Sequence, residues 1–189
     1  MKKKSLGARI AIVPTPVWVV GTYDKDEKPN AGTAAWVGVC CSKPPCVAVS
    51  FRKATYTYGN IVERQCFTVN VPPVSYAKQA DYFGIASGRD VDKFAAAGLT
   101  PVKGRLVDAP YIDEFPLVLE CKVLHTIEIG LHTQFIGEIL DAKLDESVLP
   151  EGGLPNLEDL GFFAFSPDCS TYNRISASIG KAFSIGKEI

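Results

Sequence analysis

Hydrophobic residues run in short blocks or alternate with polar residues along most of the chain, a pattern that predicts strands more often than helices. The first β-rich run spans residues 16–23, and a polar turn over residues 24–30 follows it. Residues 32–41 then predict a second strand, which Lys43-Pro44-Pro45 turns back into a third. That third strand, residues 46–51, is apolar on both faces, so we expect it to be central and buried.

Three segments between these runs have helical patterns. Residues 55–65 predict a helix with Thr55 as its N-cap, and a fourth strand at residues 67–71 follows it. Residues 75–86 have helical periodicity, and residues 90–97 predict a short helix capped by Asp90 and ended by Gly98. Residues 100–110 are expected to be irregular and extended.

Residues 115–130 and 132–146 are two long β-rich runs separated by Gly130-Leu131, which predicts a hairpin. In the first arm, one predicted face holds Leu117, Leu119, Cys121, Val123, Ile127 and Ile129. The other face holds mostly Glu120, Lys122, Thr126 and Glu128. Such alternation is typical of an antiparallel sheet with one face exposed to water. Residues 161–165 could form a last strand.

Many closely spaced strands with a few short helices predict a mainly β protein built on an antiparallel β-barrel. The 189 residues fit a single domain, 1–189, and the tail over residues 166–189 is expected to wrap over another surface. That surface is either the rest of the domain or a partner in a dimer.

The net charge of −1 argues against nucleic acid as a partner, because the chain has no broad basic field. No apolar run approaches the ~18 residues that a membrane helix needs, so we expect no membrane partner. Pro14 and Pro16 interrupt the apolar stretch near the N-terminus, which argues against a signal peptide. The expected location is therefore the cytoplasm.

Six cysteines are present, and three of them, Cys40, Cys41 and Cys46, form a cluster in the sequence. Without an export signal we expect them to be reduced. The cluster lacks C-x-x-C spacing and the chain has only His125 and His132, so no metal site is expected. Buried structural thiols are the favoured interpretation, and a redox-sensitive thiol remains open.

Residues 28–62 contain no Asp or Glu but four cations, together with many hydroxyl and small side chains. Small residues on a strand let a backbone approach a flat ligand, and cations at a helix start suit a phosphate. The window therefore fits a cradle for a flat phosphorylated cofactor. A buried hairpin with a lysine-protected rim fits these features equally well.

Six sequence blocks occur in an order that resembles the flavin reductase-like family, and its flavoredoxin branch most of all. The blocks are TAAW (33–36), PPCVAVSF (44–51), TY (55–56), FTVNVP (67–72), SGRDVDKF (87–94) and HTQFIGEI (132–139), with AFSIGK (182–187) near the C-terminus. The resemblance covers about residues 10–187. It implies the FMN-binding split-barrel fold.

The resemblance also implies a site. The isoalloxazine ring of FMN would lie along Thr33, Ala34, Ala35, Trp36 and Val37. Its ribityl chain and phosphate would meet Ser50, Phe51, Arg52, Lys53 and Thr55, with Asn60 and Tyr56 behind them. Ser87, Gly88, Lys93 and Phe94 would close over the cofactor, in this family often from the partner of a homodimer. His132 would help to position a nicotinamide, or simply bond a loop at the start of its strand.

The implied function is a homodimeric flavin reductase that binds FMN tightly, FAD being the less expected cofactor. It would take hydride from NADH or NADPH and pass electrons to free flavin, ferric iron or a redox protein. Two alternatives stay open: a flavoredoxin-type electron carrier that NAD(P)H does not reduce directly, and a non-catalytic flavin-binding protein. The sequence does not distinguish NADH from NADPH.

Overall fold

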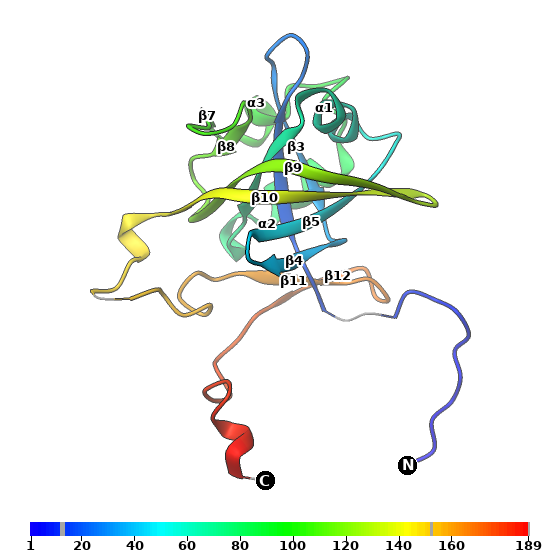
Figure 1. Cartoon of the computed structure of the whole chain (residues 1–189), viewed down its shortest axis with the longest axis vertical. Helices are drawn as coiled ribbons and strands as arrows, with labels where there is room; N and C mark the ends of the chain where they lie inside the picture. Colours follow the sequence, from blue (N-terminus) through cyan, green and yellow to red (C-terminus); the bar gives the residue numbers. More distant parts are fainter. Residues whose placement is uncertain (12–13, 152, 189) are drawn as a thin grey trace.

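The computed structural model describes residues 1–11, 14–151 and 153–188. A seven-stranded antiparallel sheet, with the order β3-β2-β6-β9-β10-β5-β4, forms most of the body (Figure 1). Its strands are β2 (Trp18–Tyr23), β3 (Pro29–Ala34), β4 (Val37–Ser42), β5 (Pro45–Arg52), β6 (Cys66–Val71), β9 (Leu117–Ile129) and β10 (His132–Leu144). The mainly β, antiparallel class is as predicted.

The sheet curls around its own interior. One buried cluster contains Ala34 from the edge strand β3, and Val37 from the opposite edge strand β4 packs against it. The rest of the sheet contributes Val20, Phe67, Phe135 and Val49 to the same cluster. Side chains from both edges can share one core only if the sheet bends toward closure, as in a barrel. Residues 46–51 are largely buried in β5, next to the edge strand β4.

The predicted strand over residues 32–41 is in fact two strands. β3 ends at Ala34 and β4 begins at Val37, and these strands lie at opposite edges of the sheet. The bend at Ala35 and Trp36 carries the chain between the edges, and the Trp36 carbonyl accepts a hydrogen bond of 3.0 Å from the Ser50 N–H. The position of this bend depends on closure of the sheet, which the alternation of residues does not encode.

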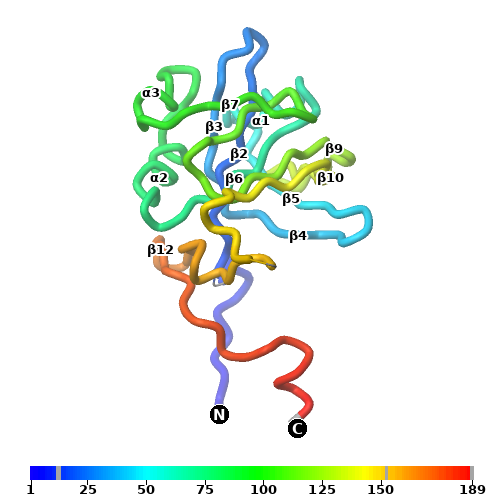
Figure 2. The backbone as a smooth tube through the Cα atoms, turned by 90° about the vertical axis from the view of Figure 1, so that its left-hand side faces the viewer, coloured from blue at the N-terminus to red at the C-terminus, as the bar shows by residue number. Residues whose placement is uncertain are grey.

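Three α-helices are present among the described residues: α1 (Tyr56–Arg64), α2 (Ala77–Ile85) and α3 (Lys93–Ala97). Thr55 caps α1 as predicted, because its Oγ1 accepts a hydrogen bond from the Tyr58 N–H. The cap of α3 is Asp92, which accepts from Ala95 N–H at 3.1 Å, and not Asp90 as predicted. In Figure 2, α2 and α3 lie on the side opposite the β4–β5 and β9–β10 hairpins.

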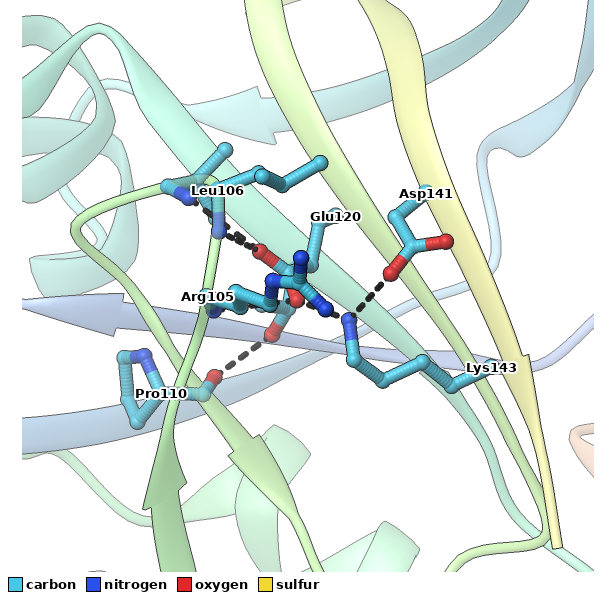
Figure 3. A network of polar contacts seen from close by, with 8 residues as sticks. Arg105, Leu106, Pro110, Glu120, Asp141 and Lys143 are labelled. Atoms are coloured by element: carbon cyan, nitrogen blue, oxygen red, sulfur yellow. Dashed lines mark hydrogen bonds and ion pairs between the residues drawn. The ribbon is translucent and has the colours of Figure 1, made fainter.

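The β9–β10 hairpin confirms the predicted pairing, but Glu120 does not face water. Its side chain is fully buried and accepts hydrogen bonds from Lys143 and from three consecutive backbone N–H groups, those of Arg105, Leu106 and Val107 (Figure 3). Lys143 also donates to Asp141 at 2.7 Å. The alternation of residues predicted that Glu120 lies on the face exposed to water. The loop over residues 104–109 instead covers that face and supplies the three backbone N–H groups that bond to the Glu120 carboxylate.

Smaller elements complete the fold. The segment predicted to be irregular holds β7 (Pro101–Lys103), which pairs with β8 (Pro110–Ile112). A second sheet consists of β1 (Thr15–Pro16), β11 (Phe163–Ser166) and β12 (Thr171–Arg174), and short 3-10 helices span Val74–Tyr76, Glu146–Val148 and Ile185–Glu188. Beyond β12 the C-terminal segment extends away from the sheets, at the same end of the molecule as the N-terminal segment (Figures 1 and 2).

No helix in the described part of the chain combines the length and apolar character required to cross a membrane.

Candidate functional site

A cavity of about 270 Å3 opens beside the first turn of α1, and we call it the α1 cavity. Its walls come from the end of β3, the end of β5, the start of α1 and the loop between α2 and α3. The lining residues are Gly32, Thr33, Phe51, Ala54, Thr55, Tyr56, Thr57, Phe83, Gly84, Ile85, Ala86, Ser87, Gly88, Arg89 and Lys93. The cavity therefore joins the cationic window of the sequence to the SGRDVDKF block within one chain.

The start of α1 gives this cavity an electropositive wall. Thr55 Oγ1 donates to the Arg52 carbonyl at 2.9 Å while it caps Tyr58, which fixes the turn between β5 and the helix. The N–H groups of Tyr56 and Thr57, in the first turn, have no partner within the helix. The helix dipole adds partial positive charge at the same end, an arrangement that favours an anion.

Lys93 supplies a buried cation to the opposite wall. Its side chain is buried, and Nζ donates to the carbonyls of Phe83 and Ala86 at 2.9 and 3.1 Å. Burial lowers the pKa of Lys93 to about 8. Among the residues that the structure describes, no carboxylate pairs with this ammonium group, so an anion in the cavity would meet its charge uncompensated.

Arg89 adds a second cation at the rim. Its guanidinium group lies 5.2 Å from the centre of the Tyr56 ring and donates to the Ala54 carbonyl at 2.9 Å. The Tyr56 hydroxyl in turn donates to Asp24 at 2.7 Å, and this hydrogen bond raises the pKa of Tyr56 to about 12. Arg89 therefore ties the loop after α2 to the first turn of α1.

A buried amide lies behind the cavity. Asn30 donates from Nδ2 to the hydroxyls of Thr22 and Thr57, both at 3.1 Å, whereas its Oδ1 has no partner among the described residues. A Cβ at Gly88 would lie only 2.3 Å from that Oδ1, so the loop backbone is seated directly on the amide. Asn60 belongs to the same network, because its Nδ2 donates to Thr22 at 3.1 Å.

Two further cavities continue from the α1 cavity along residues 33–37. One, of about 320 Å3, shares Thr33, Gly84 and Ile85 with the α1 cavity and also contacts Ala35. The next, of about 380 Å3, is mainly apolar and is lined by Ala35, Trp36 and Val37 together with Ile10 and residues 14–16. The three hollows therefore form a row that is polar and cationic at one end and apolar at the other.

His132 lies near the apolar end of the row. Its ring centre is 6.3 Å from that of Trp36, and in the sheet it pairs with Arg52 of β5. Partial burial, and then the charge of Arg52, lower the pKa of His132 below its ordinary value. Both effects favour the neutral form of the imidazole.

The structure thus brings many of the predicted residues to the row of cavities. These are Thr33, Ala35, Trp36, Val37, Phe51, Thr55, Ser87, Gly88 and Lys93. Other predicted residues do not line it: Ala34 and Phe94 are buried in the hydrophobic cores, Asn60 lies in the network behind the cavity, and Ser50, Arg52 and Lys53 lie outside the lining. Lys53 instead pairs with Glu128 at 2.6 Å.

Several lining residues were not predicted. Arg89 was not assigned to the cofactor site, although the SGRDVDKF block offered it together with Lys93 as a source of positive charge. Thr57 was noted only as one of the hydroxyl residues of the cationic window, and Ala54 and residues 84–86 gave no signal of their own. Gly32 is one of the small residues that we expected to make room for a flat ligand. Its lack of a side chain instead makes room for α1, because a Cβ there would lie 2.3 Å from Thr57 Oγ1.

Comparisons with known proteins identify the family and the fold. A family model described as a flavin reductase like domain matches residues 10–176. The flavoredoxin of Desulfovibrio vulgaris (Miyazaki F) is 54% identical, with a TM-score of 0.93 over 98% of this chain and 100% of that one. The flavoredoxin of Methanosarcina acetivorans is 31% identical, with a TM-score of 0.92 over 100% and 99% of the two chains.

The chain therefore belongs to the flavin reductase-like family. The same fold is found in a split-barrel protein of Shewanella frigidimarina. That protein is 22% identical, with a TM-score of 0.81 over 91% of this chain and 87% of the other. The predicted split-barrel class is thereby confirmed. The chain spans 64% of the length of a curated relative from Archaeoglobus fulgidus, to which it is 38% identical over 114 residues, or 60% of this chain.

Proposed function

We propose that this protein binds FMN in the row of cavities and works as a flavin-dependent oxidoreductase. The observation that carries the proposal is the α1 cavity, where a helix N-terminus meets Arg89 and Lys93, neither of which pairs with a carboxylate among the described residues. A phosphate carries about −1.5 to −2 charges near pH 7, so it suits this end of the row. The mainly apolar end along Ala35, Trp36 and Val37 suits a flat ring. The names of the two flavoredoxins support a flavin ligand.

The residues of this chain would bind and orient the cofactor, while the cofactor supplies the redox chemistry. The chemistry that FMN would supply here is acceptance of hydride from NADH or NADPH and delivery of electrons to free flavin, ferric iron or a redox protein. Thr55 and the first turn of α1 would hold the phosphate. Trp36 and His132, whose rings lie 6.3 Å apart, would border the place where a nicotinamide stacks.

We also propose that the protein is a homodimer in the cytoplasm. Ile179 and Phe183 are almost fully exposed in the C-terminal segment and Ile185 is half exposed, and exposed apolar side chains that gather in one place mark a protein–protein contact. A second copy would cover them where the segment leaves the sheets. All six cysteines are free, which is the normal state in a reducing compartment.

Anaerobic spectroscopy tests the activity. The purified protein is loaded with FMN, mixed with NADH or NADPH without oxygen, and followed at the visible absorption band of the flavin. Bleaching within seconds supports the proposed oxidoreductase. Bleaching only by a reduced protein donor would instead show an electron carrier, and no bleaching by any enzymatic donor would show a binding protein.

A further inference from the structure

The β4–β5 hairpin brings three cysteines together through an irregularity in its pairing. Val39 pairs with Val47 and Cys41 pairs with Cys46, so Cys40 is an extra residue on β4. In such a β-bulge, two residues of the bulged strand oppose one residue of its partner. Cys40 and Cys41 therefore both oppose Cys46.

Cys41 and Cys46 are the directly paired residues. They lie opposite each other in the antiparallel pairing, and burial, helped by the nearby Cys41 thiol, raises the pKa of Cys46. Directly opposed residues have Cα atoms about 4.5–5.5 Å apart, which lies inside the range of about 4.4–6.8 Å that a disulfide spans. The spacing expected of this pair is therefore compatible with a disulfide.

The two sulfurs differ in their access to solvent. Cys41 is exposed, whereas Cys46 is only 3% exposed, and burial, followed by the nearby Cys41 and Cys40 thiols and Glu138, raises the pKa of Cys46. An external reagent therefore reaches Cys41 first, and Cys46 lies behind it. In the described part of the chain, no group of three or more histidine, cysteine or acidic residues is arranged to hold a metal ion.

We propose that Cys41 and Cys46 are a redox-active dithiol, converted to an intramolecular disulfide by low-molecular-weight disulfides. The Cys41 thiol loses a proton, and its sulfur attacks one sulfur of the reagent and releases the first thiolate. The Cys46 thiol then loses its proton and attacks the Cys41 sulfur, which releases the second thiolate. One reagent disulfide is reduced to two thiols while two protein thiols become one disulfide. The oxidised hairpin joins the edge strand β4 covalently to β5.

Differential labelling of the intact chain tests this inference. Fully reduced protein is freed of reductant without oxygen and incubated with oxidised glutathione. Free thiols are alkylated with iodoacetamide in denaturant, disulfides are then reduced, and the newly freed thiols are labelled with N-ethylmaleimide before peptide mapping. We expect the second label on Cys41 and Cys46 and the first label on the other four cysteines, Cys40, Cys66, Cys121 and Cys169. Before labelling, the intact mass should be lower by two hydrogen atoms.

Three variants distinguish the Cys41–Cys46 pair from pairs that include Cys40. Cys40→Ser should still lose two thiols, whereas Cys41→Ser and Cys46→Ser should lose no thiol pair and carry at most one glutathione. The inference is wrong if the second label falls on Cys40 and Cys41, if Cys41→Ser still loses two thiols, or if the wild-type protein keeps all six thiols. The wild-type labelling pattern decides the matter even if Cys46→Ser fails to fold.

Discussion

Lys53 Nζ lies 2.6 Å from Glu128 Oε1, so the lysine that the sequence assigned to a phosphate is paired with the tip of the β9–β10 hairpin. The two side chains are 54% and 68% exposed. Exposed ion pairs contribute about 1 kcal/mol or less. Lys53 can therefore leave Glu128 for a bound phosphate at little cost.

Replacing Lys53 by Glu is expected to weaken FMN binding about tenfold, because it places a second carboxylate beside Glu128 and removes a cation near the phosphate. Quenching of flavin fluorescence during titration of the apoprotein measures the dissociation constant. The matched variant Glu128→Gln frees Lys53 and should bind FMN as well as the wild type or better. If Lys53→Glu binds FMN with the same dissociation constant as the wild type, Lys53 does not take part in FMN binding.

The charge of Lys93 gives FMN binding a defined pH dependence. Burial lowers the pKa of Lys93 to about 8, so this cation is lost as the pH rises from 7.5 to 9. His132, whose pKa is lowered from 6.5, does not titrate over this range. We expect the dissociation constant for FMN to rise about three- to fivefold over the range.

Lys93→Met should bind FMN more weakly at pH 7.5 and show no further loss up to pH 9. Isothermal titration calorimetry of both proteins at four pH values provides the comparison. A wild-type affinity that does not change with pH, or a variant with the same slope as the wild type, would show that Lys93 does not meet the ligand.

Gly88 is the point at which the loop after α2 approaches Asn30. A methyl group there would lie 2.3 Å from Asn30 Oδ1 and 2.8 Å from Tyr56 Cδ1, so Gly88→Ala must displace the loop. We expect a loss of about 1–3 kcal/mol in the free energy of unfolding, together with weaker FMN binding.

Gly59→Ala in α1 is the matched control, because nothing lies within 4 Å of the added methyl group. Alanine favours a helix over glycine by about 0.5–1 kcal/mol, so this variant should be at least as stable as the wild type. Urea denaturation measures both. A Gly88→Ala protein as stable as Gly59→Ala would contradict the close approach.

Glu120 should make the fold sensitive to acid. Burial alone would raise its pKa, but hydrogen bonds from Lys143 and from the Leu106 and Arg105 N–H groups outweigh it, so the pKa is lowered from 4.5. The folded state then binds protons less readily than the unfolded chain. The stabilisation is complete above pH 4.5 and is lost as the pH falls through the lowered value.

Glu120→Gln is expected to reduce the free energy of unfolding by about 3 kcal/mol at pH 7, because Lys143 and three backbone donors lose their buried carboxylate. The variant should also lose less stability than the wild type between pH 6 and pH 3. Denaturation curves across this range test both points. Parallel losses in the two proteins would mean that other carboxylates dominate acid unfolding.

The features predicted correctly from the sequence are those set by local chemistry. Thr55 caps α1 because its hydroxyl reaches an N–H three residues later, and Gly130 opens the β9–β10 turn with a φ of +51°. Short-range signals of this kind are present in the chain itself. The family resemblance then identified nine of the residues that line the row of cavities, among them Thr33, Thr55 and Lys93.

The errors arise where distant segments decide the outcome. Residues 32–41 were predicted to form one strand, because the bend at Trp36 is imposed by sheet closure and leaves no local signal. Glu120 was predicted to be exposed, because Leu106 in the loop that covers it lies 14 residues away in the sequence. Asp90 and Asp92 are both possible caps by spacing, and the hydrogen bond to Ala95 N–H selects Asp92.

The central claim is that the α1 cavity holds the phosphate of a flavin, and riboflavin provides the most direct test because it is FMN without that phosphate. The apoprotein is titrated with FMN and with riboflavin under the same conditions, by fluorescence quenching. The account predicts that FMN binds at least about a hundredfold more tightly, as two charge-assisted contacts would give. Equal affinities for FMN and riboflavin, or no binding of either, would contradict it.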